Sequence, residues 1–165
     1  MNVDELDHFY RRIGAAIWHL QYLEDVLVNF LVAKIVDQRR SDGQTVTSAD
    51  ARVLLTQKRR MTLGPLIQAC IEGNIIRLEL QPRFEAFKQG RHWLVHRSMV
   101  EDGDHLYADA DRDAVFSRIM SVQEEALSLK KFVFADFESW ISAQGVDLNM
   151  AQDRAENALR KLKGM

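Results

Sequence analysis

The chain has 165 residues, of which 47% are hydrophobic and 28% are charged, and its formal net charge is −2. This composition is typical of a globular protein and excludes a disordered chain, and the length suits one domain with a substantial core. The negative net charge also excludes a polycation, so any contact with nucleic acid must come from a local group of basic residues.

The cysteine content and the length of the apolar runs exclude a disulfide-linked protein and a membrane-spanning protein. Cys70 is the only cysteine, so no disulfide can form within the chain, and its apolar neighbours predict a core residue and not a nucleophile. The longest apolar run, residues 26–36, contains Asn29 and Lys34 and is too short to span a bilayer. Because the acidic N-terminus is unlike a secretory signal, we expect a cytoplasmic protein with no contact to a membrane.

A long first helix is predicted over residues 4 to about 38. Apolar residues recur there at steps of three and four, which is the period of a helix with one buried face. They are Phe9, Ile13, Ala16, Ile17, Leu20, Leu23, Leu27, Phe30 and Leu31. Trp18 and Tyr22 lie off this stripe and form a second apolar edge. A helix with two apolar sides packs against more than one neighbour, and one of these neighbours can be another subunit.

Two shorter helices are expected next. Thr47 or Ser48 can cap a helix that runs to Gln57. A third helix is expected over residues 61–72. Pro65 is tolerated in its first turn, where the missing amide would have had no partner.

A fourth helix is predicted over residues 79–98, with Pro82 in its opening turn. Gly90 lies in the middle of this helix, where glycine costs about 1 kcal/mol relative to alanine, so we expect another helix to pack closely against it. After the helix, Asp102 and Gly103 between short apolar segments form a hairpin signal. We therefore expect a small two-stranded β-hairpin there.

Asp111 is expected to cap a long fifth helix that extends to about Gln144. Its predicted apolar stripe is Phe116, Ile119, Met120, Leu127, Val133, Phe134, Phe137, Trp140 and Ile141. A sixth, more polar helix is expected at the periphery, within residues 149–165.

The sequence thus predicts a single all-α domain over residues 1–165. We expect an up-and-down bundle of five to six helices with its core in residues 5–142.

Four cationic or titratable residues, Arg91, His92, His96 and Arg97, interrupt the apolar pattern late in the fourth helix. His92 and His96 have the spacing of two metal ligands, but zinc takes three or four, and no glutamate lies between them in the metalloprotease arrangement. We therefore predict neither a metal site nor a cofactor. The second alternative is a purely structural role, because the helix dipole favours His and Arg in the last turns of a helix. From the spacing alone, this structural role is the preferred interpretation.

Phosphate chemistry is the third alternative. Arginine binds a phosphate through two parallel hydrogen bonds, and histidine exchanges protons near neutral pH. Together they could cleave RNA without a metal, through attack of a ribose 2′-hydroxyl on its own phosphodiester. Arg91 and His96 are separated by about 140° around an α-helix and about 7.5 Å along it, so we expect them to flank a groove and not to share a face. Twofold pairing of this helix with its copy would join two such sets in one cleft.

The segment Arg91-His92-Trp93-Leu94-Val95-His96 resembles the Arg-x(4–6)-His motif of HEPN (higher eukaryote and prokaryote nucleotide-binding) domains, in which a polar residue follows the arginine. The long first helix and the place of the motif late in a helix agree with this resemblance. It implies an all-α domain that forms a homodimer through the motif helices. Many members are metal-independent endoribonucleases of toxin–antitoxin, abortive-infection or CRISPR-linked defence systems.

The resemblance also implies a role for each residue of the motif. Arg91 would bind and orient the scissile phosphate, and His96 would be the acid–base group. His92 would bind substrate or hold Arg91 in place. Arg97 is next to the motif but not part of it, and would at best be an auxiliary phosphate contact. Members that are paired with nucleotidyltransferase antitoxins often carry a tyrosine two residues after the histidine. Ser98 occupies that position here, so we do not assign that system.

The leading hypothesis is therefore a homodimeric ribonuclease of bacterial stress or phage defence, with RNA and an antitoxin or other defence protein as expected partners. The alternative is a non-catalytic HEPN-like module that binds a nucleotide or a protein. The negative net charge favours this alternative, because RNA affinity depends on basic contacts that release counterions.

Two expectations about charge bear on this choice. A local basic strip would favour RNA, and its candidates are Arg59, Arg60, Arg83, Lys88, Arg91 and Arg97. Glu24 and Asp25 on the first helix are candidate partners of the motif, although helix-surface charge is the expected role.

Overall fold

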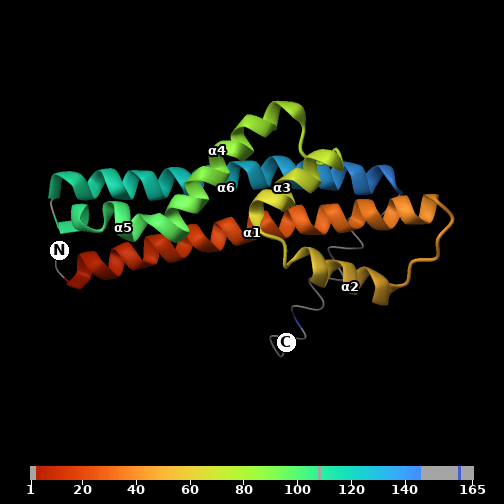
Figure 1. Ribbon diagram of the computed structural model, residues 1–165, viewed down its shortest axis with the longest axis horizontal. Coiled ribbons are helices and arrows are strands. Elements are labelled where there is room, and N and C mark those ends of the chain that lie inside the picture. Colours follow the sequence, from red (N-terminus) through yellow and green to blue (C-terminus); the bar gives the residue numbers. More distant parts are fainter. Residues whose placement is uncertain (1–2, 108, 146–159, 161–165) are drawn as a thin grey trace. The chain divides into compact units, whose positions relative to one another are not determined.

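The computed structural model describes residues 3–107, 109–145 and 160, and this part of the chain is all-α, as predicted (Figure 1). The predicted sixth helix lies outside the described residues except for Arg160. Two compact units are distinguished, residues 1–133 and 134–165, and the first contains the whole motif. The single-domain organisation stays a prediction.

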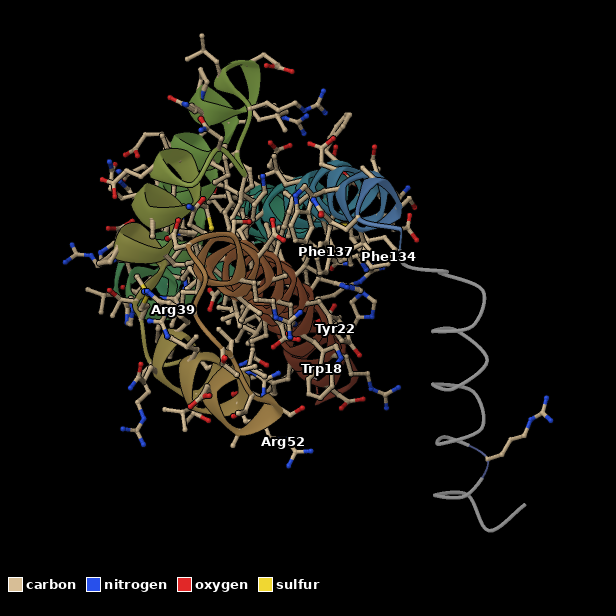
Figure 2. The ribbon with its side chains drawn as sticks, turned by 90° about the vertical axis from the view of Figure 1, so that its right-hand side faces the viewer. Trp18, Tyr22, Arg39, Arg52, Phe134 and Phe137 are labelled. Carbon is tan, nitrogen blue, oxygen red and sulfur yellow. The ribbon has the colours of Figure 1, made fainter. Side chains whose placement is uncertain are left out.

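Helix α1 (Val3–Ser41) is the longest element and confirms the predicted first helix. Its predicted stripe is buried except for Ile13 and Ile17, which are half-buried. The second apolar edge is exposed: Trp18 and Tyr22 lie side by side, with ring centroids 5.8 Å apart in an edge-to-face arrangement (Figure 2). After α1 the chain turns at Gly43, whose φ of +79° is a conformation that glycine adopts without strain.

Helices α2 (Ser48–Lys58) and α3 (Leu63–Glu72) both pack on α1. Thr47 and Asp50 form a capping box at the start of α2. The Asp50 amide donates to Thr47 Oγ1 at 3.2 Å, and the Thr47 amide donates to Asp50 Oδ2 at 2.9 Å. Cys70 on α3 is fully buried, and its burial raises the pKa of the thiol to about 12. It is a core residue, as expected.

The predicted fourth helix is a succession of helical types. A 3₁₀ turn, η1 (Leu78–Leu80), precedes α4 (Gln81–His92), and a π-helical turn, η2 (Trp93–Arg97), follows it. The predicted β-hairpin is wrong. Its place is taken by the short helix α5 (Ser98–Asp102) and a 3₁₀ turn, η3 (Asp104–Tyr107), and the described residues contain no strand. The helical path continues beyond η2, and Gly103 has a right-handed helical conformation, so no hairpin turn can form.

Helix α6 (Asp109–Ala143) runs parallel to α1 within the first unit. Contacts between the two helices advance together along both chains: Glu5 with Arg112, Phe9 with Phe116, and Tyr22 with Lys130. The contacts of α6 with α4 and η2 run in the opposite order: Arg83 with Glu125, Gly90 with Val122, and Trp93 with Arg118. The two segments are therefore antiparallel. This order is that of a bundle whose helices alternate in direction.

The close packing expected at Gly90 is confirmed. A Cβ atom at this position would lie 2.9 Å from Val122 Cγ2 on α6, so a larger residue would force Val122 or the helices to shift. The predicted stripe of α6 is only partly correct, because Met120 is 37% exposed and Phe134 is 47% exposed. The apolar residues that α6 buries follow a stricter alternation of three and four: Val115, Ile119, Val122, Ala126, Leu129 and Val133.

Within the described residues, no helix combines the length and the apolar character needed to cross a bilayer. The cytoplasmic location stays a prediction.

Candidate functional site around Arg91 and His96

The π-helical turn η2 brings Arg91 and His96 together. One terminal nitrogen of the Arg91 guanidinium lies 3.4 Å from His96 Nε2, and the two side chains share one face of the helix. The prediction that they would flank a groove is wrong because it assumed an α-helix. In η2 the Ser98 amide donates to the Trp93 carbonyl, five residues back. This wider turn lies between Arg91, near the end of α4, and His96, so the angle between their side chains differs from that in a continuous α-helix.

A carboxylate on α1 holds Arg91. Arg91 Nε donates to Glu24 Oε1 at 3.3 Å, and both side chains are about three-quarters buried, with 28% and 25% exposed. The expectation that Glu24 only contributes surface charge is therefore wrong. Asp25 is turned to another arginine, Arg59, whose terminal nitrogen lies 2.8 Å from Asp25 Oδ1. Two adjacent residues of α1 thus each bind an arginine from a different helix.

His92 joins Arg91 and His96, whereas Arg97 does not. The ring centroids of His92 and His96 are 5.2 Å apart, and both rings are exposed. Arg97 Nε instead donates to Glu101 Oε1 at 3.0 Å, one turn further along the chain. The structure therefore brings three of the four predicted site residues together and pairs the fourth with α5.

A buried tryptophan anchors the π-helical turn. Trp93 Nε1 donates to Asp102 Oδ2 at 2.6 Å, and Arg118 from α6 donates to the same oxygen at 3.2 Å. The Arg118 guanidinium also covers the Trp93 ring at 3.9 Å. Asp102 and Arg118 were not identified from the sequence as partners of Trp93. The only signal in the sequence was that charged residues are mixed with apolar ones after the motif.

The cations of α4 and η2 are all neutralised by carboxylates. Arg83 forms a two-pronged pair with Glu125 on α6, with both distances 2.8 Å, and this pairing raises the pKa of Arg83. Lys88 lies 2.6 Å from Glu85, and this contact lowers the pKa of Glu85. The predicted basic strip is therefore wrong, because only Arg60 among its members lacks an ion pair within the described residues.

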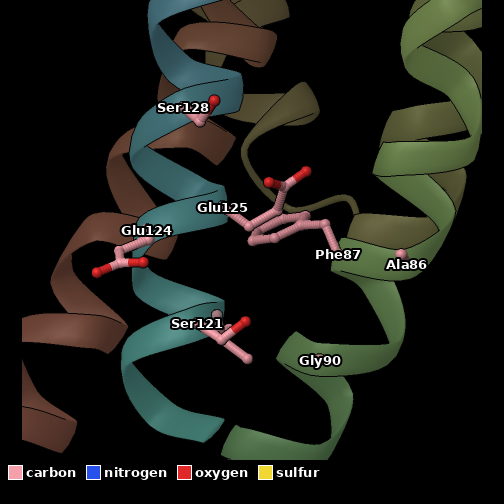
Figure 3. Close-up of a pocket in the computed structure, with 8 residues that line it drawn as sticks. Ala86, Phe87, Gly90, Ser121, Glu124, Glu125 and Ser128 are labelled. Atoms are coloured by element: carbon pink, nitrogen blue, oxygen red, sulfur yellow. The ribbon is translucent and has the colours of Figure 1, made fainter. Parts of the chain in front are cut away.

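A groove of about 530 Å³ lies between α4, which carries Phe87 and Gly90, and α6, which carries Ser121 and Glu125 (Figure 3). Arg91 instead binds α1, so this groove does not contain the motif side chains. Within the described residues, no three potential metal-ligating side chains are clustered.

No family model, curated protein or solved structure matches this chain. The function must therefore be argued from the geometry around Arg91 and His96.

Proposed function

We propose that this chain is a HEPN-type, metal-independent endoribonuclease and that Arg91 and His96 form its active site. The observation that carries the proposal is the 3.4 Å approach of the Arg91 guanidinium to His96 Nε2 on an exposed helical face. A permanent cation beside a proton-exchanging ring is the pair of groups that cleavage of a phosphodiester without a metal requires. A π-helical turn at that point supports the proposal, because such turns are frequent at functional sites.

The proposed reaction is an internal transesterification. The ribose 2′-oxygen forms a bond to phosphorus as its proton passes to His96, and the bond from phosphorus to the 5′-oxygen breaks. A second histidine gives a proton to the leaving oxygen, and His92 or a histidine of a second copy can fill this role. The products are a 2′,3′-cyclic phosphate and a 5′-hydroxyl.

Arg91 stabilises the charge that develops on the phosphate oxygens. A guanidinium has five N–H donors, and Glu24 accepts from Nε alone, so donors of Arg91 stay available to the phosphate. Glu24 fixes the direction of the guanidinium and is a positioning residue. We propose that the protein acts as a homodimer through α4 and η2, in bacterial stress or phage defence with an antitoxin or other defence partner.

The second candidate is a non-catalytic module that binds a nucleotide or a protein. The ion pair between Arg91 and Glu24 favours it, because a carboxylate that already neutralises the arginine lowers the gain from binding a phosphate.

RNA cleavage in excess EDTA distinguishes the two candidates. We expect Arg91→Ala and His96→Ala each to lower the rate by about 10²–10⁴, as is typical for loss of an acid–base group or of a charge-stabilising donor. His105→Ala is the matched control, since His105 is exposed and belongs to η3. Cyclic phosphate ends are the expected product.

If the folded wild-type protein cleaves no RNA in a broad panel but is stabilised thermally by a nucleotide, the second candidate replaces the first. Equal activity of His96→Ala and wild type would exclude His96 from the chemistry.

A further inference from the structure

The end of α1 and the helix α2 with the residues after it carry basic side chains that no carboxylate in the described part of the chain neutralises. Residues 37–60 contain six basic residues and three acidic ones, although the whole chain has a net charge of −2. One of the six, Arg59, pairs with Asp25. The other five make no ion pair with any described residue, and we call them the basic surface: Arg39, Arg40, Arg52, Lys58 and Arg60.

These residues belong to one region because α2 packs on α1. Arg52 and Arg60 line a shallow hollow of about 340 Å³ on α2. Arg52 extends outward from α2, and Arg39 is carried by the last turn of α1 (Figure 2). Arg39 also contributes to the lowered pKa of Asp50, which places it within electrostatic range of the first turn of α2.

Two of the three acidic residues of the same segment, Asp42 and Asp50, accept hydrogen bonds from uncharged donors, and the third, Asp37, makes no ion pair with any described residue. Asp50 accepts hydrogen bonds from Thr47 in the capping box, and Asp42 accepts from Gln38 Nε2 at 2.9 Å. The cations of the basic surface therefore keep their charge available for an external anion.

The chemistry of this surface favours a nucleic acid over a protein. Protein interfaces have a core of apolar and aromatic side chains, and the hollow offers only Val53 as an exposed large apolar residue. A group of cations without ion pairs suits an anion with repeating charges, because each phosphate contact releases a counterion.

We propose that the basic surface binds the phosphate backbone of single-stranded RNA and leads the strand to Arg91 and His96. The two sites meet on α1, where Asp25 binds Arg59 at the end of α2 and the adjacent Glu24 binds Arg91. The inference rests on the proposed function in one respect, namely that the anion is RNA.

Binding to a fluorescent 20-nucleotide RNA that is 2′-O-methylated throughout tests this inference, since this RNA has no 2′-hydroxyl and cannot be cleaved. The double variant Arg39→Gln/Arg52→Gln removes two charges from the basic surface. The matched control, Arg11→Gln/Lys131→Gln, removes two exposed charges elsewhere. Fluorescence anisotropy from 50 to 200 mM salt gives the affinity and its salt dependence, and circular dichroism confirms that both variants are folded.

We expect the slope of log K against log salt to become less steep by about 1.4 in the basic-surface variant, because each single-strand phosphate contact contributes about 0.7. The affinity should fall about tenfold, while the control should stay within about twofold of wild type. Equal losses in both variants, or no loss in either, would overturn the inference. Equal affinity for polyglutamate of the same charge would also overturn it, in favour of an acidic protein partner.

Cleavage assays separate this inference from the proposed function. If the basic-surface variant alone loses RNA binding but wild type never cleaves RNA, the inference stands and the ribonuclease proposal fails. If wild type cleaves RNA and both double variants cleave as well as it does, the ribonuclease proposal stands and the inference fails.

Discussion

The motif region and the basic surface both contain several cations, but they use them differently. Around the motif, every arginine and lysine of α4 and η2 has a carboxylate within 3.3 Å. At the end of α1 and on α2, five cations have no ion pair with any described residue. The number of basic residues in the sequence does not distinguish the two regions. Of these two regions, only the basic surface has cations that make no ion pair with a described residue.

This difference assigns them different tasks. A paired and partly buried arginine such as Arg91 has a fixed direction, which transition-state stabilisation requires. Cations without an ion pair are not held in a fixed direction by a carboxylate and contribute affinity through counterion release. We therefore expect the motif region to govern the rate and the basic surface to govern binding and its salt dependence.

Exchanging arginine for lysine should separate the two regions most strongly. Lysine keeps the charge but loses the planar fork of donors. We expect Arg91→Lys to lower the cleavage rate by about 10²–10³, the cost typical of losing a positioned donor. Arg52→Lys should stay within about twofold of wild type in RNA affinity and rate, measured by single-turnover cleavage and anisotropy. Equal effects of the two substitutions would mean that the regions do not differ in this way.

The anchor of the π-helical turn gives the next largest effect. Asp102→Ala removes the acceptor of Trp93 Nε1 and of Arg118, and we expect a loss of about 2 kcal/mol, because hydrogen bonds to a charged group contribute about 1.5–3 kcal/mol. For a chain of this size the melting temperature should fall by about 4–8 °C in calorimetry. Asp104→Ala, an exposed aspartate nearby, is the control.

The same variant also tests positioning. Cleavage by folded Asp102→Ala should fall while RNA affinity at the basic surface is kept, because only the motif depends on the turn. An unchanged cleavage rate would show that the turn does not position His96.

Periodicity and capping rules predicted most of the fold. The buried stripe of α1, the cap at Thr47 and the close contact at Gly90 follow from local sequence. The predicted apolar stripe of α6 was partly wrong because α6 carries large apolar residues on more than one face. The sequence pattern alone does not show which of these faces packs against the other helices.

The site was predicted less completely because its geometry depends on contacts between distant residues. Local sequence identified Arg91, His92 and His96, but an α-helix was assumed where the chain forms a π-helical turn. The Glu24 and Asp102 interactions join residues of different helices, and helical spacing cannot show which carboxylate meets which arginine.

Glu24 and Asp25 offer a smaller test of the comparison, since they are adjacent and each holds one arginine. Asp25→Asn releases Arg59 and adds a free cation beside the basic surface. We expect RNA affinity to rise about threefold and the salt slope to steepen by about 0.7. Glu24→Gln should instead lower the cleavage rate, because the direction of Arg91 is less well fixed. Anisotropy and cleavage assays on both variants check this contrast, and a fall in affinity of Asp25→Asn would contradict it.

The smallest effect concerns Asp50, an acidic residue within electrostatic range of Arg39 on the basic surface. Hydrogen bonds from the Thr47 side chain and then its backbone, with the nearby Arg39, lower the pKa of Asp50 from its ordinary value of 3.8. A lowered folded-state pKa means that the stabilisation is present above pH 3.8 and is lost as the pH falls through the folded-state value. The melting temperature of wild type should therefore exceed that of Asp50→Asn at pH 6, and the difference should shrink below pH 3.8.

Asp113→Asn on α6 is the matched control, because Asp113 is exposed and makes no ion pair among the described residues. Its melting temperature should follow that of wild type across the same pH range. At neutral pH, Asp50→Asn should also bind RNA slightly more tightly, because removing the carboxylate strengthens the field of Arg39. If stability falls and RNA affinity does not rise, Asp50 caps α2 but the RNA contact would then not include Arg39.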